Sequence, residues 1–148
     1  MEILIAVPCF NEEENIEDTL SSLANVTNQI KNHDFEFLVV DDGSFDNTKN
    51  ILSNIKHEIS IVSSITNQGL SEVFNSITHY AKQEKTDYLI VFDADMQYPV
   101  EELNNLINKI QNSQSDIVIG CRNFEKDNHF GKIKNLLQKY GSRFISYL

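Results

Sequence analysis

Apolar and polar residues divide this chain into two alternating kinds of segment. Five short runs are apolar and rich in β-branched residues, and they cover residues 3–7, 35–40, 59–63, 88–92 and 117–119. These runs are apolar on both alternating faces, which is typical of parallel strands covered by helices on both sides. The pattern therefore predicts five buried strands of a parallel sheet.

Segments with helical spacing separate these runs. Apolar residues recur every three or four positions in each segment, and they are Ile16, Leu20 and Leu23; Ile51, Leu52 and Ile55; Val73, Phe74, Ile77 and Ala81; and Leu103, Leu106, Ile107 and Ile110. Strands that alternate with helices, without an internal repeat, predict βαβ units with right-handed crossovers. We therefore expect an α/β fold, a Rossmann-like and mostly parallel sheet with helices on both faces.

Polar residues indicate where the helices begin. We expect Asn11 to cap the first helix, with Glu14 three residues later as in a capping box. Asp46 or Ser44 is expected to cap the second helix, and Pro99 suits the first turn of the fourth. No linker or low-complexity segment interrupts the pattern before residue 122, so we expect one domain over residues 1–122.

Composition and charge narrow the class of protein. The 148 residues are 41% hydrophobic and 23% charged, as in ordinary globular domains. No run approaches the roughly 20 apolar residues that span a bilayer, the N-terminus lacks a basic leader, and two cysteines make no disulfide framework. We therefore expect a cytoplasmic protein. Residues 1–121 hold 20 acidic and 6 basic side chains, a balance that argues against nucleic-acid binding.

Polar turns follow all five apolar runs. Their sequences are PCFNEEEN, DDGSFDNT, TNQGLSE, DADMQYP and GCRNF. Turns and helix caps place some polar residues at strand ends in any protein. Ligands, however, bind at the carboxyl ends of the strands in open parallel sheets, and the set of five together predicts a binding edge.

Two aspartates, Asp93 and Asp95, follow the fourth run. Residues two apart on an extended backbone point to the same side, so we expect both carboxylates to reach one ligand. Gln97 continues this spacing with an amide oxygen. Such oxygens suit a hard divalent cation, Mg²⁺ or Mn²⁺, and leave coordination positions for water and phosphate. The cation would offset the repulsion between the two carboxylates.

A second acidic pair, Asp41 and Asp42, follows the second run. Successive strand residues point to opposite faces, so only one of the pair is expected to enter the cleft. We favour Asp42, as an acceptor for ribose hydroxyls or a base N–H, and expect Asp41 to orient or cap the turn at Gly43 and Ser44. Neither GxGxxG nor GxxxxGK[ST] occurs, which disfavours the usual dinucleotide-binding fold and P-loop NTPases.

Five segments, in this order and at these spacings, resemble a known family. VPCFNEEENI, VVDDGSFDNT, NQGLSEVFNSITHYA, VFDADMQYP and DIVIGCR are similar to the family 2 inverting glycosyltransferases, and most to the polyprenyl-phosphate (dolichol-phosphate mannose synthase-like) sugar transferases. The resemblance covers residues 3–122 and implies a GT-A-type fold. It also implies metal-dependent transfer of a sugar from a nucleoside diphosphate-sugar to a polyprenyl phosphate or, alternatively, to a polysaccharide or glycan hydroxyl.

The resemblance implies roles for individual residues. Those matched to nucleotide-sugar binding are Pro8, Phe10, Glu12, Val40, Asp42, Asp93, Ala94 and Asp95, and those matched to the metal are Asp93, Asp95 and Gln97. Arg122 matches an arginine that helps hold the diphosphate or the acceptor phosphate. Asp93, Asp95 and Arg122 are therefore the expected catalytic residues, since a cation and an arginine stabilise charge on a departing diphosphate.

The chain departs from the family pattern in two places. Leu70 follows Asn67 and Gly69 where Lys or Arg is usual, so we expect Leu70 to pack against the sheet. The sequence ends at Leu148, without the acidic motif that supplies the catalytic base of soluble members. We therefore expect either a C-terminally truncated sequence or an acceptor, such as a lipid phosphate, that is already an anion.

The last residues carry the opposite charge. Residues 122–148 hold 6 basic and 2 acidic side chains, and apolar residues recur at helical spacing among the lysines. Such a pattern is typical of an interfacial helix on an anionic membrane, and also of a helix that packs its apolar stripe on its own domain. We expect 123–148 to be a basic amphipathic tail, with peripheral contact of 132–148 at the inner face of the membrane as one outcome.

Two other protein classes have acidic strand ends. A nucleotidyltransferase would need a Gly-rich basic loop after the first strand, where this chain has the acidic PCFNEEEN. A non-enzymatic receiver-like module would need a lysine at a late strand end, where IVIGCRNF offers an arginine. Both classes are therefore disfavoured.

Overall fold

The computed structural model describes residues 1–113 and 115–120. The chain divides into two compact units, Met1–Asn105 and Leu106–Leu148. The elements of the first unit are β1 (Glu2–Cys9), α1 (Ile16–Thr27), β2 (Asp34–Asp41), α2 (Thr48–Asn54), β3 (Ser60–Ser63), α3 (Leu70–Glu84), β4 (Tyr88–Val91) and the short 3-10 helix η1 (Val100–Glu102). Helix α4 (Leu103–Asn112) begins in the first unit and ends in the second.

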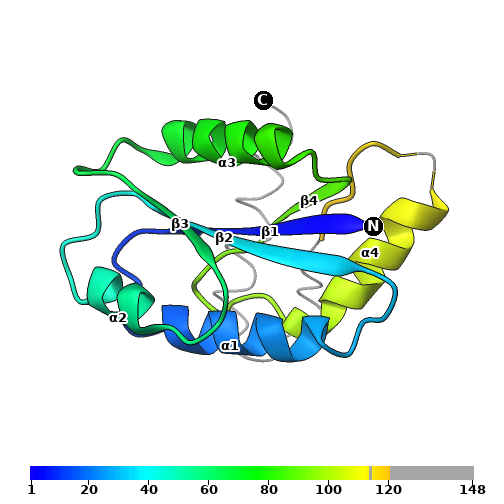
Figure 1. Cartoon of the computed structure of the whole chain (residues 1–148), viewed down its shortest axis with the longest axis horizontal. Helices are drawn as coiled ribbons and strands as arrows, with labels where there is room; N and C mark the ends of the chain where they lie inside the picture. The colour runs from blue at the N-terminus through cyan, green and yellow to red at the C-terminus, as the bar shows by residue number, and fades with distance from the viewer. Residues whose placement is uncertain (114, 121–148) are drawn as a thin grey trace, which may run out of the picture. The chain divides into compact units, whose positions relative to one another are not determined.

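The strands of the first unit form one parallel sheet in the order β3-β2-β1-β4. Helix α3 covers one face of the sheet, and α1 and α2 cover the other (Figure 1). The predicted α/β architecture, with helices on both faces, is confirmed. The strand order reverses between β1 and β4, and ligands bind at such a switch point in open α/β sheets.

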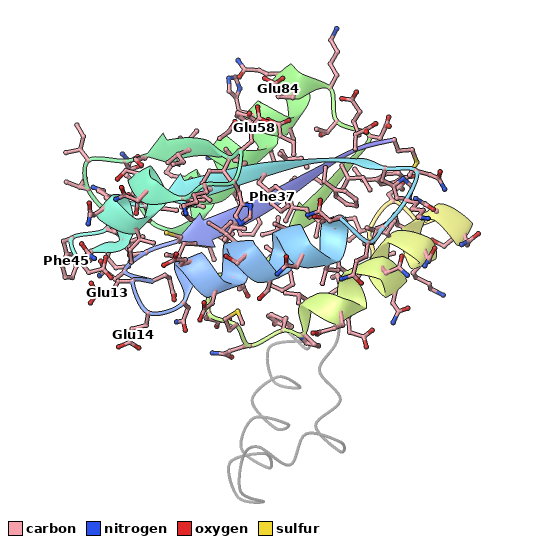
Figure 2. All side chains as sticks on the ribbon, turned by 60° about the horizontal axis from the view of Figure 1, so that its bottom comes forward. Glu13, Glu14, Phe37, Phe45, Glu58 and Glu84 are labelled. Atoms are coloured by element: carbon pink, nitrogen blue, oxygen red, sulfur yellow. The ribbon has the colours of Figure 1, made fainter. Side chains whose placement is uncertain are left out.

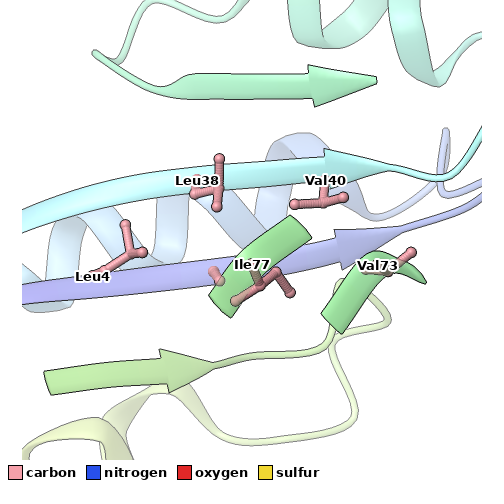
Figure 3. Close-up of a cluster of buried hydrophobic side chains, with 6 residues drawn as sticks. Leu4, Leu38, Val40, Val73 and Ile77 are labelled. Atoms are coloured by element: carbon pink, nitrogen blue, oxygen red, sulfur yellow. The ribbon is translucent and has the colours of Figure 1, made fainter. Parts of the chain in front are cut away.

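Alternating residues of the two central strands reach the two helical layers. On the α3 face they form a buried cluster with this helix (Figure 3), made up of Leu4, Ala6, Leu38, Val40, Val73 and Ile77. The intervening residues of β1 point to the opposite face, and Ile3, Ile5 and Val7 are at most 1% exposed. Burying each such aliphatic side chain contributes about 1.5–3 kcal/mol, so the core fixes the sheet that carries the strand ends.

The predicted fifth strand is wrong. Residues 117–119 form no strand, and Ile117 and Ile119 are 76% and 77% exposed. A strand needs a hydrogen-bonded neighbour, and within residues 1–113 and 115–120 no strand pairs with this run. Three apolar residues with strand-like composition do not by themselves provide that neighbour.

The helix starts differ from the predicted caps. Asn15 rather than Asn11 precedes α1, and Asn47 precedes α2, each without a side-chain cap. Asp46 nevertheless accepts the backbone N–H of Thr48, the first residue of α2, at 3.0 Å. Pro99 lies directly before η1, which leads into α4. The predicted residues Asp46 and Pro99, which lie within two positions of a helix start, therefore mark helix starts, whereas Asn11 does not.

The predictions for the basic tail concern residues after the described part of the chain. The predicted boundary at residue 122, the tail over 123–148 and the membrane contact over 132–148 lie outside the described residues. Within the part of the chain that is described, no helix combines the length and the apolar character needed to cross a bilayer.

Candidate functional site

A cleft of about 300 Å³ lies at the carboxyl ends of β1, β2 and β4. The ends of these strands and the segments after them, together with the loop before α3 and the first residues of α3, supply its walls, which are lined by Pro8, Cys9, Phe10, Glu12, Asp42, Asn67, Gly69, Leu70, Val73, Asp93, Ala94 and Asp95. All the residues predicted to bind the nucleotide-sugar, except Val40, line this cleft. The structure therefore brings together four segments of the chain whose residues lie up to 87 positions apart in the sequence, from Pro8 to Asp95.

Asp93 and Asp95 reach the cleft through a turn. Strand β4 ends at Val91, so the prediction of an extended backbone through Asp93 and Asp95 is wrong. Met96 has a φ of 56°, and the Asp95 carboxylate accepts the backbone N–H of Gln97 at 3.0 Å, which closes an Asx turn. Asp93 and Asp95 nevertheless line the same cleft.

Helix α1 holds the backbone between these aspartates. The Thr19 hydroxyl donates to the carbonyl of Ala94 at 2.8 Å, and both residues are buried. Sequence reasoning missed Thr19. The available signal was a threonine on the apolar face of α1, between Ile16 and Leu23, where a polar side chain needs a buried partner.

Asp42 lines the cleft while it organises the loop before α3. Its two carboxylate oxygens accept the backbone N–H groups of Gln68 at 2.8 Å and Gly69 at 2.9 Å. Next to it, Gly43 has a φ of 76°, and a Cβ there would lie 2.4 Å from the carbonyl carbon of Thr66. The residues after β2 thus contact residues 66–69 closely, through the hydrogen bonds of Asp42 and the close approach of Gly43. The sequence did not indicate these contacts.

Leu70 forms part of the cleft wall instead of packing against the sheet. It is 63% exposed and lines the cleft at the first position of α3, so the packing prediction for Leu70 is wrong. Its neighbours Asn67 and Gly69 also line the cleft, which gives this wall no basic side chain among its described residues.

Hydrogen bonds join the loop after β1 to the loop after β2. Asn11 donates its backbone N–H to the Ser44 hydroxyl at 2.8 Å, and its side-chain oxygen accepts the N–H of Phe45 at 3.0 Å. Two further bonds run from Glu12 N–H to the Thr48 hydroxyl at 2.9 Å and from the N–H of Asn47 to the Glu13 carboxylate at 2.8 Å. This interlock, defined by residues 11–13 and 44–48, fixes the loop that presents the cleft residues of β1.

An aromatic contact closes the same interlock. The rings of Phe10 and Phe45 meet edge to face with centroids 5.9 Å apart, and Figure 2 shows Phe45 and Glu13 at the same end of the domain. Desolvation acts to raise the pKa of Asp46, but hydrogen bonds from Thr48 and from the Glu13 backbone outweigh it and lower that pKa. An ionised Asp46 is therefore part of this arrangement.

Two buried groups, Asp41 and Cys9, lie at the ends of β2 and β1, and Cys9 also lines the cleft. Asp41 is fully buried, accepts the N–H of Ser44 at 3.0 Å and lies 3.8 Å from the Lys49 ammonium, which confirms its predicted role in orienting the turn. Burial and the neighbouring charge of Asp41 raise the pKa of Cys9 to about 12. The Cys9 thiol is therefore protonated at neutral pH, and it is not a nucleophile.

Two predicted site residues, Val40 and Gln97, do not line the cleft, and the prediction for Arg122 is not tested. Val40 is 2% exposed and belongs to the core cluster on the α3 face. The backbone of Gln97 closes the Asp95 turn, and Gln97 is not among the residues that line the cleft. Arg122 lies outside the described residues.

The cleft carboxylates fit a sparsely coordinated divalent ion. Asp93 is exposed and Asp95 is half-buried, so both can meet a cation that keeps much of its water. Across residues 1–113 and 115–120, no three His, Cys, Asp or Glu side chains are grouped as metal ligands. Mg²⁺ is commonly bound by one or two carboxylates together with substrate phosphates, and the pair matches that requirement.

Comparison with known proteins identifies the family. The model of glycosyl transferase family 2 matches residues 4–146. Dolichol-phosphate mannosyltransferase of Pyrococcus furiosus is 31% identical over 137 residues, which cover 91% of this chain and 36% of that protein. Undecaprenyl-phosphate 4-deoxy-4-formamido-L-arabinose transferase of Shewanella sediminis is 30% identical over 148 residues, which cover 99% of this chain and 42% of that protein. The chain thus spans less than half the length of these two relatives, whose names bear out its resemblance to the polyprenyl-phosphate sugar transferases.

Solved structures share the fold. S. aureus TarS 1-349 in complex with UDP has a TM-score of 0.55 and 26% identity, covering 75% of this chain and 32% of that one. The mannosyltransferase PcManGT from Pyrobaculum calidifontis, in complex with GDP-Man and Mn²⁺, has the same TM-score at 19% identity, covering 71% and 31%. The predicted GT-A-type fold is therefore confirmed. Because the family model extends over nearly the whole sequence, this chain belongs to glycosyl transferase family 2.

Proposed function

We propose that the cleft binds a nucleoside diphosphate-sugar and that the protein transfers the sugar, with inversion, to a polyprenyl phosphate. The observation that carries this proposal is the presence of Asp93 and Asp95 on the same cleft as Phe10, Glu12 and Asp42. The names of the relatives, which transfer sugars to dolichol phosphate or undecaprenyl phosphate, support the choice of acceptor.

The walls of the cleft suit the two halves of a nucleoside. Phe10 is 38% exposed, and beside Pro8 it offers an apolar surface to a base. Glu12 and Asp42 present carboxylate oxygens that would accept hydrogen bonds from ribose hydroxyls or from a base N–H. The base and the ribose would therefore lie on the side of the cleft formed by β1 and β2.

The opposite side of the cleft would hold the diphosphate. Asp93 and Asp95 would bind Mg²⁺ or Mn²⁺, and Arg122 is a predicted contact for the diphosphate or the acceptor phosphate. When bound, such an ion would neutralise diphosphate oxygens and stabilise the negative charge that develops on the diphosphate as its bond to the sugar breaks. Without a cation, these two carboxylates would repel the same phosphates.

Transfer requires little proton chemistry from the described residues. An oxygen of the acceptor phosphate attacks the anomeric carbon from the side opposite the leaving group, and the bond from that carbon to the diphosphate oxygen breaks, so the configuration inverts. A phosphate acceptor is already ionised at neutral pH, and no general base is needed. Contact of the basic residues 132–148 with a membrane would favour a lipid acceptor of this kind.

Thermal stability tests this proposal directly. Mn²⁺ together with UDP or GDP should raise the Tm, because a ligand that binds only the folded state stabilises it. Either nucleotide with a chelator, and acetyl phosphate with Mg²⁺, should produce little change. Asp95→Asn should remove the shift and leave the Tm of the free protein intact, whereas Asp116→Asn, at an exposed position, should behave like the wild type. A wild-type protein that shows no shift with either nucleotide and metal would contradict the proposal.

A further inference from the structure

We infer that Thr19 is a positioning residue for the two cleft aspartates. Its hydroxyl donates to the carbonyl of Ala94 at 2.8 Å, and Ala94 is the residue between Asp93 and Asp95. The inference rests on the proposed function, in which these aspartates face a divalent ion and a diphosphate.

The Thr19 hydroxyl donates to a carbonyl outside its own helix, which is unusual for a helical threonine. A threonine within a helix commonly returns its hydroxyl to a carbonyl three or four residues earlier, and Thr27 of the same helix does so, donating to Ala24 at 3.1 Å. The Thr19 hydroxyl instead reaches a carbonyl 75 positions later. Thr19 is 0% exposed, so water cannot replace this bond if it is lost.

The acceptor lies where the sheet no longer holds the chain. Strand β4 ends at Val91, and Phe92 still donates its N–H to Ala6 of β1 at 2.9 Å. Residues 94–96 then form a turn in which Met96 has a φ of 56°. The bond from Thr19 thus anchors the turn to α1 just after the sheet hydrogen bonds stop.

This anchor acts on the aspartates through the backbone. The Ala94 carbonyl belongs to the peptide group that leads into Asp95, so fixing its direction fixes the start of the Asp95 side chain. Groups that orient metal ligands typically change metal affinity by about 10–100-fold when they are removed. Loss of the Thr19 hydroxyl should therefore weaken the effect of the metal more than the binding of the nucleoside.

Three variants separate positioning from general stability. Thr19→Val has a similar shape without the donor, Thr19→Ser keeps the donor, and Thr27→Val removes a buried hydroxyl that bonds within α1. The measurements are the Mn²⁺ concentration that half-saturates UDP or GDP binding, and the affinity for uridine or guanosine without metal. Both are made at a temperature where circular dichroism shows each variant to be folded.

We expect Thr19→Val to raise the half-saturating Mn²⁺ concentration about tenfold and to leave nucleoside affinity unchanged. Thr19→Ser and Thr27→Val should match the wild type in both measurements. If Thr19→Val does not fold, Thr19→Cys, which keeps a weak S–H donor, should show a smaller increase in the same direction.

Other outcomes overturn the inference. An unchanged Mn²⁺ requirement in the folded Thr19 variant, or an equal change in Thr27→Val, would leave Thr19 with a purely structural role. These results would not affect the proposed function, since the wild type would still bind nucleotide and metal. A wild type that binds neither UDP nor GDP with Mn²⁺ would instead remove the proposed function, and this inference with it.

Discussion

The carboxylate of Asp42 accepts the backbone N–H of Gly69 at 2.9 Å, across 27 positions of sequence. Its other oxygen accepts the N–H of Gln68, so the end of β2 fixes the loop that brings Leu70 to the cleft. We expect Asp42→Asn to lower the free energy of unfolding by about 1–3 kcal/mol, because one N–H would face an amide NH₂ group. Urea denaturation measures the change, and Asp116→Asn provides a matched exposed control. Equal stability of the two variants would show that the loop does not depend on Asp42.

Gly43 should tolerate no side chain. Alanine at this position would combine a φ of 76° with a Cβ placed 2.4 Å from backbone atoms of Thr66, and we expect Gly43→Ala to destabilise the fold by about 2–4 kcal/mol. Gly69 is the matched control, because its φ is 90° but a Cβ there would meet nothing within 4 Å. Gly69→Ala should therefore cost about 1–3 kcal/mol from backbone strain alone, because a φ of 90° with a ψ of 161° is essentially restricted to glycine. The two unfolding midpoints test this order, and the reverse order would contradict the close approach.

Asn11 combines a left-handed backbone with a side-chain acceptor. Its φ is 56°, and its side-chain oxygen accepts the N–H of Phe45. Asn11→Ala should lose both advantages and lower the free energy of unfolding by about 1–3 kcal/mol. Asn11→Gly relieves the backbone only, and Asn11→Asp keeps the acceptor, so both should be more stable than the alanine variant in urea denaturation. If all three were equally stable, neither property would matter.

The raised pKa of the Cys9 thiol should make the free energy of unfolding decrease at high pH. Its pKa rises from 9.0 to about 12 on folding, chiefly through burial. Between these values the unfolded chain loses a proton that the folded protein keeps, so stability falls as pH rises, by up to about 1.4 kcal/mol per pH unit. Unfolding free energies of the wild type and Cys9→Ala, measured from pH 9 to 11, should diverge with this sign. Parallel pH profiles would show that the thiol does not contribute.

Much of the fold could be predicted from the sequence because burial on both faces leaves a clear pattern. The four apolar runs of the first unit correspond to β1, β2, β3 and β4, which lie within two residues of the expected bounds. The run at 117–119 failed because pairing depends on a neighbouring strand, which three residues cannot specify. The cap predicted at Asn11 failed for a related reason, since Phe45 is a competing partner for its side chain.

The sequence predicted which strand ends form the cleft, but it did not predict the hydrogen bonds that hold the cleft residues in place. Acidic residues after β1, β2 and β4 converge as expected, because parallel strands end at one edge. The Thr19 bond to Ala94 and the grip of Asp42 on residues 68 and 69 join positions far apart in sequence. Hydrogen bonds of this kind depend on the packed structure and leave no periodic signal.

The interlock of residues 11–13 with 44–48 also limits how related sequences can vary in length. Donors and acceptors alternate between the two loops, so an insertion or deletion of one residue in either loop would displace several partners at once. Within residues 1–113 and 115–120, the mostly exposed connection before β3 at residues 55–59 forms no such set of paired hydrogen bonds with another loop. Gaps in alignments of close relatives should therefore gather at this connection, and the spacing within the two loops should stay constant.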